Sequence, residues 1–207
     1  MYNPLINKYA DVLVNYSTKV SKGDLVIIYA RGYSCQPLVK EIYKLCLKNG
    51  ANPIVRTSMD ELAETFIKYA SDEQLEYIDE MSKIEVERAD VMIFIGAPNN
   101  IKNMANADNS KLAKRSKATL PILSKRLERS ASGDMRWVIA DYPTNALAQE
   151  ANMSLEEYKA IHPIFEEDIY EAVSLKTCVE NRLTAGGPAP EAMKAVIENR
   201  KEWLATI

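Results

Sequence analysis

The chain has 207 residues, of which 47% are hydrophobic and 27% charged, the composition of one soluble globular domain or at most two small ones. Lys and Arg number 26 against 29 Asp and Glu, and the resulting formal net charge of −3 argues against a protein whose main task is binding nucleic acid. The only histidine is His162, which excludes a His-rich zinc site.

Short apolar runs alternate with amphipathic stretches along the chain. In chain order, the predicted elements are a helix within Met1–Val20, a strand at Leu25–Ala30, a helix that opens at Pro37 and closes at Asn49-Gly50, a strand at Pro53–Thr57, helices at Asp60–Tyr69 and Asp72–Met81, a strand at Val91–Ile95, a helix at Asp108–Arg129, a strand at Trp137–Ala140 and a helical remainder from Asn145. Pro121 is expected to kink or break the long helix, because proline lacks the amide hydrogen and clashes with the preceding turn. Further breaks are expected at His162-Pro163 and Ala185–Pro190, and the last helical segment, Ala189–Leu204, either packs on the domain or leads out of it.

The alternation of apolar strands with helices predicts the fold class. Short, continuously apolar strands are typical of a parallel sheet that is covered on both faces. We therefore expect an α/β fold with a doubly wound, mainly parallel sheet of about four or five strands flanked by helices. Residues 1–207 are expected to form one such domain.

The cysteines indicate a reducing compartment. Cys35 and Cys46 lie on one predicted helix, about 16 Å apart along its axis, which is too far for a disulfide. Cys178 is the third cysteine, and the chain has no C-x-x-C pair. The sequence does not open with a signal peptide, and apolar runs such as Val91–Ala97 are too short to span a bilayer. We expect a soluble, cytoplasmic protein with no membrane or nucleic-acid partner.

In a doubly wound sheet, ligands bind at the carboxyl ends of the strands. The three loops that leave these ends are Ala30–Ser34, Gly96–Asn100 and Asp141–Thr144. The first has one glycine where a dinucleotide fingerprint needs three, and no G-K-[ST] occurs in the chain. Ordinary turns are therefore favoured over a phosphate cradle.

Two charged segments could suggest a binding site. Lys111–Arg129 holds seven basic residues and one acidic residue, but no aromatic residue for base stacking, so a solvated helix face is favoured. An acidic cluster around the histidine comprises Glu156, Glu157, His162, Glu166, Glu167 and Asp168. It lacks the H-E-x-x-H spacing of a metallopeptidase helix, and its acids are better explained as residues near helix starts.

The candidate nucleophiles are Ser34, Cys35 and Ser132. None of them lies in a local signature such as G-x-S-x-G. A distant pairing with His162 is open to each of the three and supported for none.

The order of local motifs carries a resemblance to a known family. The chain reads L-x-x-K-Y-A-D-x-L-V, then K-G-D-x-V-x-I, then P-L-V-x-x-I-Y with Asn49-Gly50-Ala51, and finally MRWVIADYPTNALAQEANMSLEEY over Met135–Tyr158. This series resembles the N-terminal domain of the thermophilic-type, metal-dependent aminopeptidases, the aminopeptidase T and aminopeptidase S family. The likeness extends from Leu5 to about Leu204, and Arg136–Tyr158 is its most specific part.

The resemblance implies a cytoplasmic exopeptidase that uses two divalent metals of the zinc or cobalt type, with a Glu as general base. In that family the ligands and the base lie in a C-terminal domain beyond the matched region, so no residue of this chain inherits a catalytic or metal role, and substrate-binding residues stay unassigned. We expect the chain alone to be inactive, a non-catalytic N-terminal domain whose partners are its own C-terminal catalytic domain, small peptides as substrate of the whole enzyme, and a second copy if that enzyme is a homodimer.

Two alternatives remain at this stage. The chain could be a small-molecule or nucleotide-binding module that uses the strand exits at Gly32, Gly96 and Tyr142. It could also be a non-catalytic interaction module that exposes an apolar patch on its last helix. The patch would contain Met193, Val196, Ile197 and Trp203.

Overall fold

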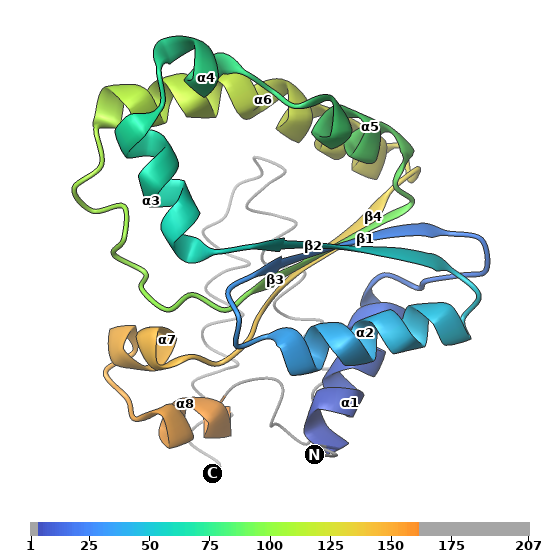
Figure 1. Cartoon of the computed structure of the whole chain (residues 1–207). Coiled ribbons are helices and arrows are strands. Elements are labelled where there is room, and N and C mark those ends of the chain that lie inside the picture. The colour runs from blue at the N-terminus through green and yellow to red at the C-terminus, as the bar shows by residue number, and fades with distance from the viewer. Residues whose placement is uncertain (1–3, 162–207) are drawn as a thin grey trace, which may run out of the picture.

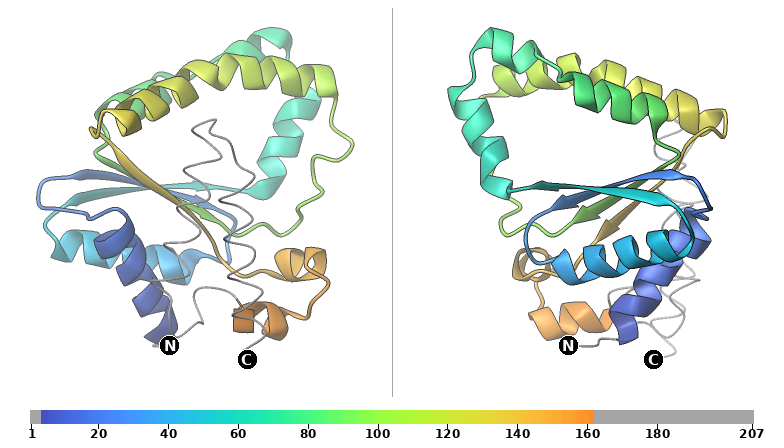
Figure 2. Two further views of the ribbon diagram at one scale, coloured as in Figure 1. Left: turned by 180° about the vertical axis from the view of Figure 1, so that it is seen from behind. Right: turned by 45° about the vertical axis from the view of Figure 1, so that its right-hand side comes forward.

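Four parallel strands form one sheet in residues 4–161, the part of the chain that the computed structural model describes (Figure 1). In chain order they are β1 (Leu25–Arg31), β2 (Asn52–Ser58), β3 (Val91–Gly96) and β4 (Arg136–Asp141). Their spatial order is β2-β1-β3-β4, and every neighbouring pair is parallel. Helices lie on both sides of the sheet (Figure 2), which confirms the predicted doubly wound α/β fold.

The central strands β1 and β3 are mainly apolar because both faces of the sheet are covered there, whereas the edge strands β2 and β4 also carry polar residues. Ile28, Ile93 and Val138 pair in register and belong to the main core on one face. Ile27 and Met92 pair in register on the other face, where a smaller core lies. A continuous apolar run is therefore what each central strand requires.

The main core is closed by α1 (Pro4–Asp11), the π-helix η1 (Val12–Ser17) and α2 (Gln36–Lys48). The helix predicted within Met1–Val20 ends at Ser17. The backbone amide and the hydroxyl of Thr18 both donate to the carbonyl of Leu13, over 3.2 and 2.7 Å. These two bonds widen the last turn and end the helix, since side-chain bonds to the backbone compete with regular helical bonding.

The opposite layer contains α3 (Asp60–Tyr69), α4 (Asp72–Glu76), α5 (Glu80–Arg88) and α6 (Asn109–Ala131). The single helix predicted at Asp72–Met81 is wrong, because the chain forms the short α4 and then a separate α5 that the sequence analysis missed. Ser71 caps α4 in a capping box, and Asp79 caps α5 by accepting from the amide of Ser82 over 3.0 Å. The second cap starts a new helix where a continuous one was expected.

Pro121 does not break the long helix, which was one of the two outcomes predicted for it. α6 runs for 23 residues with Pro121 inside it. Contacts of α6 with α4 and α5 hold the helix on both sides of the proline, and tertiary packing of this kind overrides the local preference. No helix within the described range is both long enough and apolar enough to cross a bilayer, α6 included.

Two short helices follow β4 at the carboxyl end of the sheet, α7 (Asn145–Glu150) and α8 (Leu155–Ile161) (Figure 1). The helical stretch predicted from Asn145 is interrupted here, because Asn152 takes a left-handed conformation with φ 56°. The features predicted further along the chain lie outside the described residues: Cys178, the breaks at His162-Pro163 and Ala185–Pro190, and the helix Ala189–Leu204 with its apolar patch.

Candidate functional site

The order β2-β1-β3-β4 places the topological switch point between β1 and β3, where a doubly wound sheet offers its crevice. The predicted exit loops meet there, but they are in direct backbone contact. Gly32 has φ +87°, and a Cβ built on it would lie 2.9 Å from the carbonyl carbon of Ala97 and closer still to its oxygen. The amide of Ala97 also donates to the carbonyl of Arg31 over 2.8 Å. The two exit loops are thus closed against each other at the switch point, which disfavours the nucleotide alternative.

Asp60 ties the strand exits together. Its buried carboxylate accepts from the amide of Asn99 over 2.8 Å, and the guanidinium of Arg31 lies 4.0 Å away. Next to this group, Gly96 leaves room for the carboxylate of Asp141, whose Oδ1 would lie 2.7 Å from a Cβ at that position. At the carboxyl ends of the strands, Asp60 is thus held by structural contacts, and Asp141 packs against Gly96.

A cavity of about 910 Å³, the larger of the two described here, opens on the α5 and α6 side of the sheet. Its wall includes the strand ends at Arg31 and Asp141, and its floor includes the rings of Tyr29 and Phe94. These two rings are stacked, with centroids 5.0 Å apart and an angle of 7° between their planes. The floor comes from adjacent strands, since the two residues pair in register across β1 and β3.

A buried carboxylate, Glu85 of α5, is held at the side of this cavity. Its Oε2 accepts from the hydroxyl of Tyr29 over 2.6 Å, and its Oε1 accepts from Nε of Arg56 over 2.5 Å. Desolvation by burial, together with the hydrogen bond to Glu85, raises the pKa of Tyr29 above its ordinary range, so the phenol stays a neutral donor. Both oxygens of Glu85 are thus occupied by described residues.

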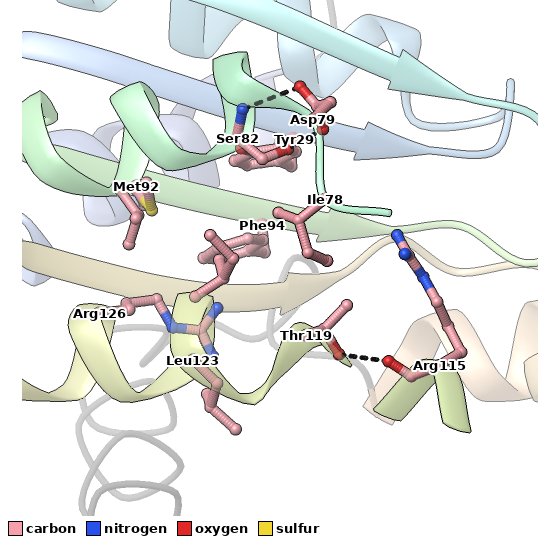
Figure 3. A pocket seen from close by; sticks show the side chains of 12 residues that line it. Tyr29, Ile78, Asp79, Ser82, Met92, Phe94, Arg115, Thr119, Leu123 and Arg126 are labelled. Carbon is pink, nitrogen blue, oxygen red and sulfur yellow. Dashed lines mark hydrogen bonds between the residues drawn. The ribbon is translucent and has the colours of Figure 1, made fainter. Parts of the chain in front are cut away.

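A second cavity, of about 280 Å³, continues from the first beneath α5 and α6 (Figure 3). Met92, Ile122 and Leu123 supply apolar walls, and Arg126 reaches in from α6. The guanidinium carbon of Arg126 lies 5.0 Å from the centroid of the Phe94 ring, and it also faces the ring of Trp137. Burial lowers the pKa of this guanidinium, which still stays protonated at neutral pH.

The candidate nucleophiles are not activated. Cys35 is fully buried, its thiol donates to the carbonyl of Gly32 over 3.3 Å, and burial raises its pKa. The hydroxyl of Ser132 donates to the carboxylate of Asp134 over 2.6 Å at the end of α6. Ser34 lies exposed in the loop after β1, and His162 lies outside the described residues. A thiol of raised pKa is a poor nucleophile.

The basic stretch of α6 attaches this helix to its neighbours. Lys111 donates to the carbonyl of Ala70 over 3.0 Å, Arg115 to that of Tyr77 over 2.6 Å, and Arg129 to that of Ala89 over 2.7 Å. These carbonyls follow α3, α4 and α5, whose last turns lack internal partners for their carbonyls. The expected solvated face therefore also has a structural role.

The acidic cluster is only partly described. Glu157 accepts from the amide of Ser154 at the start of α8, and Glu156 pairs with Lys159 over 2.8 Å. Both contacts agree with the interpretation that these acids belong to a helix start. The other members, His162, Glu166, Glu167 and Asp168, lie outside the described residues.

Comparison with known proteins gives the family. A family model described as thermophilic metalloprotease (M29) matches residues 2–177, most of the chain. The chain belongs to this family. The solved structure of wild-type AmpT from Thermus thermophilus shares the fold of this M29 chain, with a TM-score of 0.63 at 19% sequence identity. That likeness covers 78% of this chain and 43% of the AmpT chain. The predicted family is therefore confirmed, on a match that stops earlier than the expected limit near Leu204.

Curated proteins match shorter stretches of the M29 chain. Argininosuccinate lyase from Lachnospira eligens is 63% identical over 46 residues, which is 22% of this chain and 10% of the lyase. Argininosuccinate lyase from Lachnoclostridium phytofermentans is 55% identical over 53 residues, or 26% of this chain and 12% of that protein. The chain thus spans about a tenth of the length of these relatives. Matches of this extent do not show that the chain is an argininosuccinate lyase.

An M29 protein is metal-dependent by family, so the described residues can be tested as a metal centre. Within residues 4–161, no three His, Cys, Asp or Glu side chains come together in a group that could hold a metal ion. Asp60 and Glu85, the two buried carboxylates, are engaged by Asn99 and Arg31 and by Tyr29 and Arg56. The described residues therefore do not fit a metal centre. That no residue of the chain is catalytic or metal-binding stays a prediction.

The sequence analysis missed the cavity residues. The apolar runs around Tyr29 and Phe94 predict only buried strands, and the pattern around Arg126 predicts only a basic helix face. No local motif marks these rings, and what brings them together is the register that pairs Tyr29 with Phe94 across β1 and β3. That register is known only once the sheet is assembled.

Proposed function

We propose that this M29 chain provides the N-terminal, non-catalytic domain of a metal-dependent aminopeptidase. The divalent metals, of the zinc or cobalt type, and the general base would then belong to a second domain. The observation that carries the proposal is the family match over residues 2–177 in a chain whose described buried carboxylates are committed to structural bonds.

The likeness to AmpT supports this division of labour. It covers 43% of the AmpT chain and most of this one, as a domain of a longer enzyme would. In such an enzyme the chemistry would be release of N-terminal residues from peptides, with the metals activating water. The present domain would cover the active-site cavity and restrict it to small peptides.

The first experiment is a hydrolysis assay on the purified full chain. Leucine p-nitroanilide and a Leu-Gly-Gly peptide are offered with Zn²⁺ or Co²⁺, and AmpT serves as the positive control. We expect no release above the buffer blank. Metal-dependent release that a chelator abolishes would contradict the non-catalytic assignment.

A second experiment tests the covering role in an M29 enzyme that carries both domains. Peptides of increasing length are compared before and after removal of the region equivalent to residues 4–161. We expect the shortened enzyme to lose its preference for short peptides. An unchanged length preference in a folded, active product would refute the covering role.

A further inference from the structure

The cavity under α5 and α6 contains a cation without a described counter-ion. The guanidinium of Arg126 lies over the rings of Phe94 and Trp137, and its Nε is buried without a hydrogen-bond partner among the described residues. Buried polar groups are nearly always hydrogen-bonded, and a missing bond costs free energy. Arg126 also lines both cavities, so a ligand's acceptor can pair with this guanidinium there.

Two acidic residues that share a cavity wall with this cation, Asp79 and Glu85, are already engaged. Asp79 accepts from the amide and hydroxyl of Ser82, over 3.0 and 2.5 Å. Glu85 accepts from Tyr29 and Arg56. The other cation of the wall, Arg115, donates to backbone carbonyls. Arg126 is therefore the group in this wall that can receive an anion.

The other residues of the cavity wall determine which kind of group can be attached to the negative charge of a ligand. Met92 and Ile122 line the inner end, Leu123 is a partly exposed part of the wall, and the Tyr29 and Phe94 rings form the floor. Figure 3 shows Arg126 beside Phe94, with the apolar side chains grouped around them. A cavity of about 280 Å³ suits a small molecule, since ligand pockets are mostly apolar with a few fixed polar groups. A dianion such as a phosphate would leave one charge unpaired in these surroundings.

We propose that the cavity between the sheet and helices α5 and α6 binds a small monocarboxylate with an apolar body, whose carboxylate pairs with Arg126 and whose body lies on the Tyr29–Phe94 stack. The carboxylate lies at Arg126, which lines both cavities. The apolar body fills the inner end beside Ile122. The proposal is tested by a binding assay, which does not depend on aminopeptidase activity.

The test uses 3-phenylpropionate as probe and 3-phenylpropionamide as a neutral control of the same shape. Each is titrated into the full chain, and binding is followed by amide NMR shifts. We expect the acid to bind at least about tenfold more tightly than the amide, because a charge-assisted hydrogen bond is lost with the charge. Equal binding of acid and amide, or no binding of the acid at millimolar concentration, would overturn the proposal.

Variants then assign the charge to one residue. Arg126→Met keeps an apolar stem and is expected to weaken acid binding at least about tenfold while leaving amide binding nearly unchanged. Lys117→Met removes the same charge from an exposed position of α6 and should leave both affinities unchanged. A folded Arg126→Met chain with unaltered acid affinity would refute the assignment. If that variant does not fold, the comparison of acid with amide on the unaltered chain still decides.

Discussion

Replacing Gly32 by alanine tests the closed switch point between β1 and β3. Gly32 has φ +87°, a left-handed conformation that costs an alanine about 1–2 kcal/mol. The new Cβ would also lie 2.9 Å from the carbonyl carbon of Ala97, and the atom in the way is backbone rather than a flexible side chain. Overpacking of this kind costs about 1–3 kcal/mol more. We expect a total loss of about 2–5 kcal/mol in the free energy of unfolding.

Gly133→Ala is the matched control. Gly133 has φ +82°, and a Cβ there would meet nothing within 4 Å, so only the conformational cost of about 1–2 kcal/mol applies. Urea denaturation of the wild type and both variants measures the difference, and a slope of about 2 kcal/mol/M turns an extra 2 kcal/mol into a midpoint about 1 M lower. Equal losses for Gly32→Ala and Gly133→Ala would show that the two exit loops are not in contact, and the nucleotide alternative would have to be considered again.

Three further predictions concern buried polar groups and the long helix. Glu85→Ala should lower the free energy of unfolding by about 1–3 kcal/mol, because it leaves the partly exposed Arg56 unpaired. The control, Glu80→Ala at an exposed position of the same helix, should change it by less than about 0.5 kcal/mol. Urea denaturation measures both, and similar losses would contradict the buried network. Burial raises the pKa of Cys46 to about 11, so near pH 9 the thiol ionises in the unfolded chain while it stays protonated in the folded one. The contribution of this thiol to the free energy of unfolding is therefore complete below pH 9 and is lost as the pH rises to 11. Cys46→Ala should therefore show a shallower fall of stability over that window, and an identical fall would argue against a buried thiol. Pro121→Ala should raise the melting temperature, because alanine restores an amide hydrogen inside a continuous helix; a lower one would mean that the packing of α6 requires the proline.

The predicted and observed elements agree where local pattern and burial coincide. The runs Leu25–Ala30 and Val91–Ile95 are apolar and lie in β1 and β3, and the helix at Asp60–Tyr69 has the predicted bounds. They disagree where a single contact decides. The Asp79 cap separates α5 from α4, the bonds of Thr18 end η1, and packing carries α6 through its proline. None of these outcomes follows from propensity, since each depends on which partner lies nearby.

The candidate site shows the same limit more strongly. The strand exits could be named from the sequence, because parallel strands place their carboxyl ends at one edge. Whether those exits are open could not, since the contact of Gly32 with Ala97 joins loops far apart in the chain. The cavity of Arg126 and Phe94 was likewise beyond sequence reasoning, because a cation and a ring from different elements become neighbours only when α6 packs on the sheet.

What the sequence by itself determined was the class of fold and the family, because apolar periodicity and the order of short motifs are written along the chain and need no partner to be read. Tertiary structure alone decided strand order, the closed switch point, the caps and the cavity chemistry. Those features rest on contacts between distant segments, and their distances, burial and hydrogen bonds exist only after the layers have packed together.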